Sequence, residues 1–326
     1  MTTSSDSRTP IRLTRVSWET PHVHRFQFEG LDGRPLHAWE AGAHINVYLP
    51  NGLVRAYSLC GVPSAAPSCY EIAVKCEASG RGGSAAIHEL RVGCELQISA
   101  PRNVFALSDT ACHALLLGGG IGITPLVAMA HQLHQVGRQF TLAVFARTRE
   151  SLPLRTILEN SAWRHCVSVH LDDEAEPVRP ADLIERSPLG CHVYFCGPAG
   201  FMEGVQQATK HWSPDRVHFE YFQAPAVSAP VPLTTAEPTA RSFNVHLARR
   251  NMTLAVPHNQ TIAHVLQSAG VPVDTVCEQG ICGSCVTPYL EGHPAHKDMC
   301  LAESERASNI ALCCSRSVSD LLTLDL

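Results

Sequence analysis

The chain has 326 residues, of which 45% are hydrophobic and 17% charged, and its formal net charge is −5 at pH 7. This length exceeds what one hydrophobic core usually organises, so two or three domains are expected. Acidic and basic residues are interspersed, which gives no basis for a nucleic-acid partner, and no apolar run approaches the roughly 20 residues that a membrane-spanning helix needs.

Fourteen cysteines and eighteen histidines are spread through the chain. The N-terminal stretch MTTSSDSRTP is polar and lacks the apolar segment of a secretory signal, so we expect a cytoplasmic protein with reduced thiols, some of them bound to metal. The histidines are scattered and suggest no metal site of their own. Seven cysteines show no ligand spacing and are interpreted as small buried side chains: Cys60, Cys69, Cys76, Cys94, Cys112, Cys166 and Cys191.

The first third of the chain, residues 11 to about 107, contains six short strand-like runs separated by Gly, Pro, Asn and Asp. Such runs without a long helical pattern predict a small antiparallel β-barrel, which we assign to residues 1–108.

Two short motifs in this segment suit a bound phosphate and an aromatic ring. In RAYSLCG, residues 55–61, Arg55 can hold a phosphate with bidentate geometry, Tyr57 offers an aromatic face and Ser58 a hydroxyl. In GRGGS, residues 80–84, a glycine-rich turn precedes a predicted short helix, and its amides with Arg81 and Ser84 can bind an anion. An ordinary strand and a surface turn are the alternatives.

From residue 113 the pattern changes to strands that alternate with helices, which predicts a parallel sheet covered on both faces over residues 109–225. LLLGGGIGITPL, residues 115–126, reads as a strand, a glycine turn and a helix, and its glycines permit close approach of a dinucleotide. YFCGPAGF, residues 194–201, is a second strand-to-helix turn. A helix N-terminus and a buried core thiol are the alternatives.

The last third begins after a proline-rich linker, which we assign to residues 226–240. SFNVHLARRNMTLAVP predicts a hairpin, TIAHVLQSAG a short helix that ends at Gly270, and DLLTLDL a closing strand. These elements belong to a C-terminal domain over residues 241–326.

Between this helix and strand, CEQGICGSC places Cys277, Cys282 and Cys285 at C-x4-C-x2-C spacing. With one distant cysteine, this is the plant-type [2Fe–2S] spacing, in which four thiolates hold two irons. Zinc sites usually use paired C-x2-C knuckles, and unliganded thiols are a further alternative. Gly280 and Gly283 allow backbone amides to approach the sulfur atoms.

The fourth ligand is sought in ALCCSRS, where Cys313 and Cys314 are adjacent. Neighbours on a strand face opposite sides, so only one of them can face the cluster. We favour Cys313, and interpret Cys300 as a bystander.

These motifs in this order identify a family. The tail resembles a plant-type ferredoxin of β-grasp fold, RAYS resembles the R-x-Y-S motif of ferredoxin-reductase-like flavin domains, and GGIGITP and CGP resemble their nicotinamide markers. From about residue 10 to 326 the chain resembles the phthalate dioxygenase reductase family, which includes vanillate demethylase reductases and related reductases of Rieske oxygenases.

The resemblance implies FMN rather than FAD, and residue roles as follows. Ser58, Thr124 and Cys196 position the flavin and nicotinamide for hydride transfer. The flavin and its phosphate lie against Arg55, Ala56, Tyr57, Ser58, Ala73, Val74, Lys75, Arg81, Gly82, Gly83 and Ser84. The pyridine nucleotide lies against Gly119, Gly120, Ile121, Gly122, Thr124, Pro125, Arg147, Cys196, Gly197, Pro198 and Phe222.

Two points of this assignment stay open. Arg147 and Arg149 could accept a 2′-phosphate and favour NADPH, whereas the resemblance favours NADH, which we expect. Glu220 and Phe222 either cover the flavin or nicotinamide or simply pack at an edge strand.

NADH supplies two electrons at once, a [2Fe–2S] cluster accepts one at a time, and a flavin can do both. We therefore expect an NADH-dependent reductase that passes electrons through FMN and the cluster to a terminal Rieske non-haem iron oxygenase, and we expect a monomer. The chain has no Rieske C-x-H pair, so it should not itself be an oxygenase. A reductase for a di-iron hydroxylase or a cytochrome P450, or a non-enzymatic redox sensor or carrier, are the alternatives.

Overall fold

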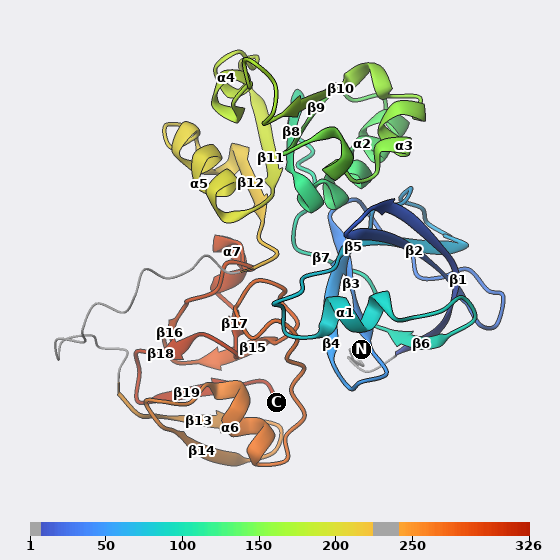
Figure 1. Cartoon of the computed structure of the whole chain (residues 1–326). Coiled ribbons are helices and arrows are strands. Elements are labelled where there is room, and N and C mark those ends of the chain that lie inside the picture. The colour runs from blue at the N-terminus through green and yellow to red at the C-terminus, as the bar shows by residue number, and fades with distance from the viewer. Residues whose placement is uncertain (1–7, 224–240) are drawn as a thin grey trace. The chain divides into compact units, whose positions relative to one another are not determined.

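The computed structural model describes residues 8–223 and 241–326. The chain divides into two compact units, Met1–Phe222 and Gln223–Leu326 (Figure 1). The linker predicted at residues 226–240 lies outside the described residues.

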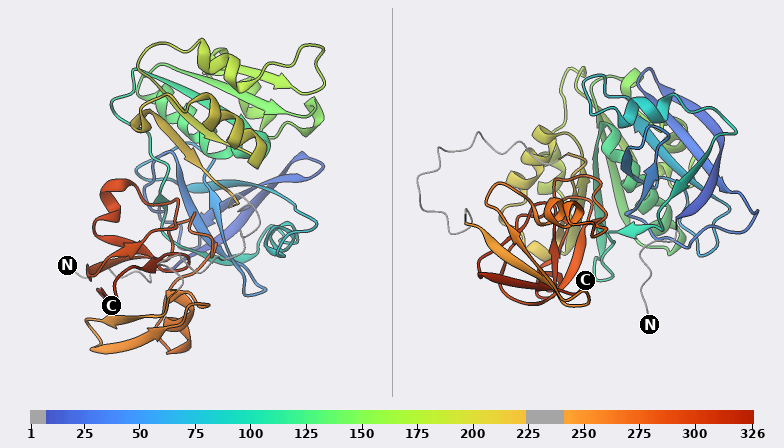
Figure 2. Two further views of the ribbon diagram at one scale, coloured as in Figure 1. Left: turned by 90° about the vertical axis from the view of Figure 1, so that its left-hand side faces the viewer. Right: turned by 90° about the horizontal axis from the view of Figure 1, so that it is seen from below.

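The first unit contains an antiparallel barrel, drawn from blue to cyan in Figures 1 and 2. Its strands follow the order β4-β3-β6-β1-β2-β5, with β7 paired to β3. A bridge between Leu59, which follows β4, and Ile72 of β5 joins the two ends of this order. The elements are β1 (Thr9–Thr20), β2 (Val23–Gly30), β3 (Ala43–Tyr48), β4 (Val54–Ser58), β5 (Cys69–Lys75), α1 (Gly83–His88), β6 (Glu95–Ile98) and β7 (Arg102–Asn103).

Alternation of side chains explains why these runs form a barrel. In β1, Ile11 and Leu13 are fully buried while Arg12 between them is exposed. Phe26 and Phe28 of β2 repeat the pattern. One side of each strand therefore fills the barrel, as the predicted antiparallel fold requires.

The same unit contains a five-stranded parallel sheet of order β10-β9-β8-β11-β12. Helices cover both faces, with α2 and α3 on one side and α4 and α5 on the other (Figure 1). Leu116 joins the core on the α2 face, whereas Leu115 and Leu117 pack with α4 and α5. The elements are β8 (His113–Gly119), α2 (Ile123–Gln135), β9 (Phe140–Ala146), α3 (Arg155–Asn160), β10 (Val167–Leu171), α4 (Pro180–Glu185), β11 (Cys191–Cys196), α5 (Ala199–Ala208) and β12 (Val217–Glu220).

Short 3₁₀ turns connect several of these elements. They are η1 (Gly120–Gly122), η2 (Arg149–Ser151), η3 (Arg164–Cys166) and η4 (Pro214–Arg216).

The second unit is a β-grasp domain built on a mixed sheet of order β14-β13-β19-β15-β17. The hairpin β13–β14 is antiparallel, and β19 pairs parallel to β13, so the first and last parts of the unit meet in the middle of the sheet. Helix α6 packs against this sheet through Ile262 and Leu266. The elements are β13 (Phe243–Leu247), β14 (Met252–Val256), α6 (Ile262–Ser268), β15 (Val286–Glu291), β16 (Pro294–Ala295), α7 (Glu303–Arg306), β17 (Asn309–Ala311), β18 (Arg316–Ser317) and β19 (Leu321–Leu324).

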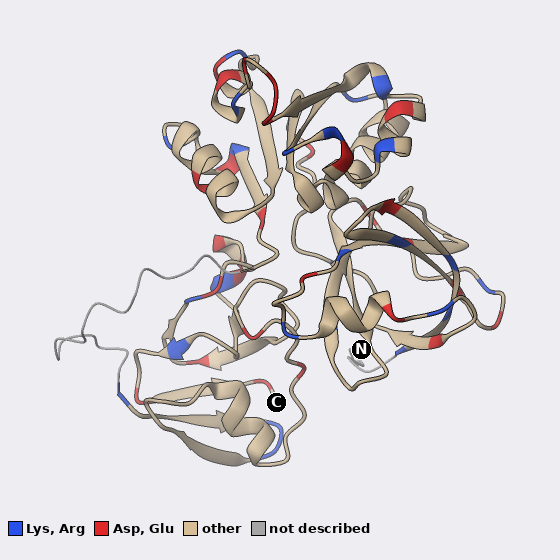
Figure 3. Cartoon of the chain, viewed as in Figure 1, with Lys and Arg blue, Asp and Glu red and all other residues tan. Residues whose placement is uncertain are grey.

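The predicted fold class is confirmed, with an antiparallel barrel, a parallel α/β sheet and a β-grasp domain. The prediction that the seven unassigned cysteines are buried is wrong for Cys112, which is exposed on the loop before β8. Of the other six, Cys60 and Cys191 are buried and the rest are half-buried. Lys and Arg are interspersed with Asp and Glu over the ribbons (Figure 3).

No helix within residues 8–223 or 241–326 is both long and apolar enough to cross a bilayer.

Candidate cofactor sites

The structure brings Arg55 of β4 together with the predicted anion-binding turn. The Arg55 guanidinium donates 2.9 Å to the carbonyl oxygen of Arg81 and 2.8 Å to that of Val54. Gly83 begins α1 directly against this side chain, and a Cβ there would lie 2.5 Å from Arg55 Cγ. A side chain at residue 83 would therefore displace Arg55, so the glycine and the arginine together shape the turn.

Other flavin residues predicted from the sequence are held by local contacts. Ser84 Oγ accepts a 3.0 Å hydrogen bond from the backbone N–H of Glu77, and Lys75 forms a 2.7 Å ion pair with the same Glu77. Burial raises the pKa of Tyr57 to about 12, although Arg55 acts in the opposite direction. The tyrosine therefore stays uncharged well above physiological pH.

The two nicotinamide markers lie side by side at the carboxyl ends of β8 and β11, which are neighbours in the sheet. A Cβ at Gly122 would lie 2.3 Å from the carbonyl oxygen of Cys196, and one at Gly119 would lie 3.0 Å from Pro198. Thr124 is buried and its hydroxyl donates 3.2 Å to the carbonyl of Ile121. Ligands of open α/β sheets bind at this edge, where the strand order reverses.

A buried polar contact links this edge to the barrel. Ser58 Oγ, at the end of β4, donates 2.9 Å to Glu220 Oε2, at the end of β12. Cys196 is the strand neighbour of Glu220, and burial followed by the charge of Glu220 raises the pKa of this thiol well above its usual value. Burial also raises the pKa of Glu220 to about 7, against the hydrogen bond from Ser58.

The sequence left the roles of Glu220 and Phe222 undecided. Glu220 is part of the buried contact, while Phe222 is 40% exposed. No local motif marks Glu220. Its position at the end of a parallel strand was the available signal.

Arg147 follows β9 and is exposed, whereas Arg149 is held 3.0 Å from Glu159 of α3. The loop after β10 meets this strand end, because Asp172 N–H donates 3.0 Å to the carbonyl of Ala146. Of the two arginines that could accept a 2′-phosphate, Arg149 is thus already bound to a carboxylate.

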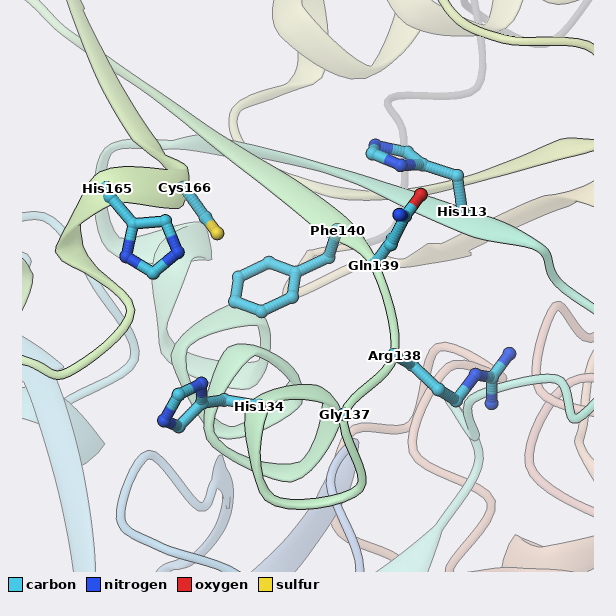
Figure 4. Close-up of a pocket in the computed structure, with 8 residues that line it drawn as sticks. All are labelled: His113, His134, Gly137, Arg138, Gln139, Phe140, His165 and Cys166. Carbon is cyan, nitrogen blue, oxygen red and sulfur yellow. The ribbon is translucent and has the colours of Figure 1, made fainter.

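A pocket lies away from these residues, at the amino edge of the parallel sheet (Figure 4). It has a volume of about 340 Å³, and Phe140 and His113 in its wall are the first residues of β9 and β8. None of the predicted site residues lines it. The lining residues are His113, His134, Gly137, Arg138, Gln139, Phe140, His165 and Cys166.

The thiols of the cysteine loop in the second unit contact one another and Cys313. Cys277 hydrogen-bonds with Cys282 and with Cys313, and Cys285 with Cys313, so that hydrogen bonds lower the pKa of both Cys277 and Cys285. The backbone N–H of Gln279 donates 3.3 Å to Cys277 Sγ. Amides that point at the sulfur stabilise thiolate charge, as the glycine-rich loop predicts.

Among the described residues, no group of three or more His, Cys, Asp or Glu is arranged to hold a metal ion as it stands. Contacts of Cys277 with Cys282 and Cys313, and of Cys285 with Cys313, nevertheless bring four thiols together, and four thiolates are the ligands of a binuclear cluster. Two bridging sulfides occupy two positions of each iron, which leaves two thiolates for each. The residues therefore fit a [2Fe–2S] cluster better than a single ion.

The strand expected around Cys313 and Cys314 ends earlier. Strand β17 ends at Ala311, and both cysteines lie in the turn that follows, so strand alternation does not separate them. Cys313 is buried and contacts Cys277, Cys285 and Cys314. Cys314 is half-buried: its Sγ contacts the carbonyl of Ala311 at 3.9 Å and Ser315 Oγ at 3.8 Å, and it lies 2.6 Å from the place of a Cβ on Gly280.

Known proteins share these features. The family described as the 2Fe-2S iron-sulfur cluster binding domain matches residues 245–318. The vanillate O-demethylase oxidoreductase of Pseudomonas sp. (strain HR199 / DSM 7063) is 41% identical over 308 residues, which cover 92% of this chain and 94% of that protein. The fold, the site and these matches define an oxidoreductase that transfers electrons from pyridine nucleotide through flavin to [2Fe–2S].

Two solved structures extend the comparison. Phthalate dioxygenase reductase matches with a TM-score of 0.70 and 36% identity, covering the whole of both chains. A type IV self-sufficient cytochrome P450 monooxygenase matches with a TM-score of 0.88 and 33% identity, covering 98% of this chain, which spans 41% of that protein. The chain belongs to the phthalate dioxygenase reductase family.

Membership confirms the predicted family and the predicted reductase function in an oxygenase system. The predicted cofactors, FMN, NADH and a [2Fe–2S] cluster, are confirmed as those of this family.

Proposed function

We propose that the chain is the reductase component of a Rieske-type oxygenase or demethylase system and takes its electrons from NADH. The observation that carries this proposal is the cluster of four thiols in the second unit, Cys277, Cys282, Cys285 and Cys313. The first unit of the same chain joins the flavin and nicotinamide motifs through the contact between Ser58 and Glu220. The vanillate O-demethylase oxidoreductase and phthalate dioxygenase reductase matches support an oxygenase as the partner.

In this proposal, residues of the first unit bind and orient the flavin and nucleotide. Arg55 and the turn at residues 80–84 hold the FMN phosphate, because the Arg55 guanidinium lies against this glycine-rich turn. Ser58 and Cys196 lie beside the reacting rings, and Thr124 fixes the glycine turn through Ile121. When bound, the flavin takes a two-electron hydride and releases single electrons.

The remaining cofactor contacts that we propose are those predicted from the sequence. They are Ala56, Tyr57, Ala73, Val74, Lys75, Arg81, Gly82, Gly83, Ser84, Gly119, Gly120, Ile121, Gly122, Pro125, Arg147, Gly197, Pro198 and Phe222.

In the second unit, we propose Cys277, Cys282, Cys285 and Cys313 as the cluster ligands. We also propose the domain division 1–108, 109–225 and 241–326, which follows the barrel, the parallel sheet and the β-grasp sheet. A cytoplasmic location and a monomeric state complete the proposal.

A second candidate partner is a cytochrome P450. The 0.88 TM-score to a self-sufficient P450 monooxygenase favours it, because a region of that protein similar to this chain occurs with a P450 in one polypeptide. The chain spans only 41% of that protein but 94% of the vanillate O-demethylase oxidoreductase. The more complete match to the vanillate O-demethylase oxidoreductase therefore favours an oxygenase as the partner.

The test is an anaerobic NADH titration of the full-length protein, followed by absorbance and low-temperature EPR. We expect the flavin to bleach and a rhombic [2Fe–2S] signal to appear. Bleaching without that signal would contradict the cluster assignment. NADH-reduced protein is then mixed with a purified Rieske-type demethylase or with a purified bacterial cytochrome P450. Faster reduction of the P450 would replace the Rieske partner with the second candidate.

A further inference from the structure

A buried carboxylate lies behind the cysteine loop of the second unit. The Asp298 side chain is fully buried, and its Oδ1 accepts a 3.2 Å hydrogen bond from Ser315 Oγ and lies 3.3 Å from His296 Nδ1. Its Oδ2 accepts 3.2 Å from the backbone N–H of Leu301. An anion away from water needs such donors, so this carboxylate is held in one orientation.

The same residue connects the two segments that carry the proposed ligands. The backbone N–H of Met299 donates 2.9 Å to the carbonyl of Gly280, in the middle of the CEQGICGSC loop. Gly280 has a φ of +72°, and a Cβ there would lie 3.0 Å from Asp298 Cα. Ser315 follows Cys313 by two positions. Asp298 thus packs against the loop on one side and is hydrogen-bonded to the Cys313 segment on the other.

The charge of Asp298 is only loosely compensated. Arg306 of α7 approaches Oδ2 at 3.9 Å, and its shorter contact, 3.0 Å, is to the backbone carbonyl of Asp298. Arg306 is also shared with the exposed Glu303 at 3.8 Å.

We propose that Asp298 is a positioning residue of the iron–sulfur site and that its buried charge lowers the reduction potential of the bound cluster. The inference rests on the proposed ligands. A reduced [2Fe–2S] cluster carries one more negative charge than the oxidised cluster, so a fixed negative charge nearby disfavours reduction. Because Asp298 is buried, solvent and salt screen this effect less than they screen a surface charge.

The experiment is an EPR-monitored redox titration of full-length protein. Asp298→Asn keeps the shape but removes the charge, and we expect the ratio of reduced to oxidised cluster at a fixed potential to rise at least threefold, or about 28 mV for one electron. Arg306→Gln removes the compensating cation and should shift the potential in the opposite direction. Asp320→Asn, whose side chain is 90% exposed, is the control and should leave the potential unchanged.

The two variants with opposite signs separate charge from mere structural support. If both leave the potential unchanged, or both move it in the same direction, the proposal is wrong. If Asp298→Asn holds no cluster, the shift in Arg306→Gln decides alone: a more negative potential supports the proposal and no shift overturns it. Wild-type protein without a [2Fe–2S] signal would instead overturn the proposed function.

Discussion

Ser58 and Glu220 are 162 positions apart in the chain, and their side chains share a buried 2.9 Å hydrogen bond. Ser58 ends a barrel strand and Glu220 ends a strand of the parallel sheet. The contact therefore joins the two sheets beside Cys196, where the flavin and nicotinamide motifs meet. A carboxyl at such a place can change its protonation near neutral pH, because its pKa is raised to about 7.

Glu220 should make the first unit less stable as the pH rises. The folded chain holds this proton more tightly than the unfolded chain, whose glutamate has a pKa near 4.5. The stability from this group is therefore complete below about pH 4.5 and is lost as the pH rises through about 7. Glu220→Gln should be more stable than wild type by roughly 1–3 kcal/mol at pH 8, and close to it at pH 4.5.

Urea unfolding of the flavin-free, full-length protein measures this difference. All four tryptophans lie before residue 223, so their fluorescence reports the first unit alone. Glu303→Gln, a carboxylate 94% exposed in the second unit, should leave the curve unchanged. An equal gain for Glu220→Gln at both pH values would mean that the carboxyl does not titrate in this range.

Ser58→Ala should slow the reduction of FMN by NADH. The change removes the hydroxyl that donates to Glu220 in the buried contact. Loss of one positioned hydrogen bond of about 1.4–2.8 kcal/mol corresponds to a roughly tenfold to hundredfold lower rate. Stopped-flow single turnover measures it, with FMN affinity determined in parallel.

Ser64→Ala is the matched control, because Ser64 Oγ accepts a surface hydrogen bond from the N–H of Ala66 in the same barrel. It should keep the wild-type rate. A wild-type rate in Ser58→Ala would remove Ser58 from the hydride-transfer site.

Gly122→Ala should disturb the nicotinamide site through the backbone. The added Cβ would lie 2.3 Å from the carbonyl oxygen of Cys196, and backbone atoms cannot move aside as a side chain can. We expect a destabilisation of roughly 1–3 kcal/mol and a higher KM for NADH. Gly204→Ala in α5, where nothing lies within 4 Å of the new Cβ, should be neutral or slightly stabilising. Equal behaviour of the two variants would contradict the close packing of the two motifs.

Local patterns in the sequence were enough to predict much of this fold. Ile11, Arg12 and Leu13 alternate between the barrel interior and solvent, so the strand period is visible in the residues themselves. The spacing of Cys277, Cys282 and Cys285 is likewise local, because one loop carries all three.

Contacts between distant segments were not predictable in this way. Nothing around Glu220 indicates that its partner is Ser58, and nothing around Asp298 indicates a contact with Ser315. Helix α7 has four residues, too few to show a helical period. The apolar run before Cys313 resembles a strand, but the chain turns after Ala311.

The preference of the protein for NADH over NADPH should depend on Glu159. This carboxylate holds Arg149 at 3.0 Å, so wild-type protein should have a higher kcat/KM for NADH than for NADPH. Glu159→Gln releases Arg149 to meet a 2′-phosphate, and kcat/KM for NADPH should rise several-fold, with little change for NADH. Glu95→Gln, which releases Arg12 from a 2.8 Å ion pair on the barrel, is the control. Wild-type preference for NADPH would overturn the assignment to NADH.

The two adjacent cysteines after β17 should differ in their effect on the cluster. The Cys313 thiol hydrogen-bonds with those of Cys277 and Cys285, whereas Cys314 Sγ contacts Cys313, Ala311 and Ser315. Cys313→Ser should therefore lose most of the bound iron and the rhombic EPR signal of the reduced protein, while Cys314→Ser should keep both.

Iron content per chain and EPR after dithionite reduction measure this difference without any need for NADH. Cys300→Ser, a buried thiol outside the proposed ligand set, is the control for loss of a cysteine side chain and should keep the signal. Retention in Cys313→Ser with loss in Cys314→Ser would exchange the two assignments. The turn after Ala311 would then have to rearrange when iron binds, since Cys313 now makes the contacts with Cys277 and Cys285.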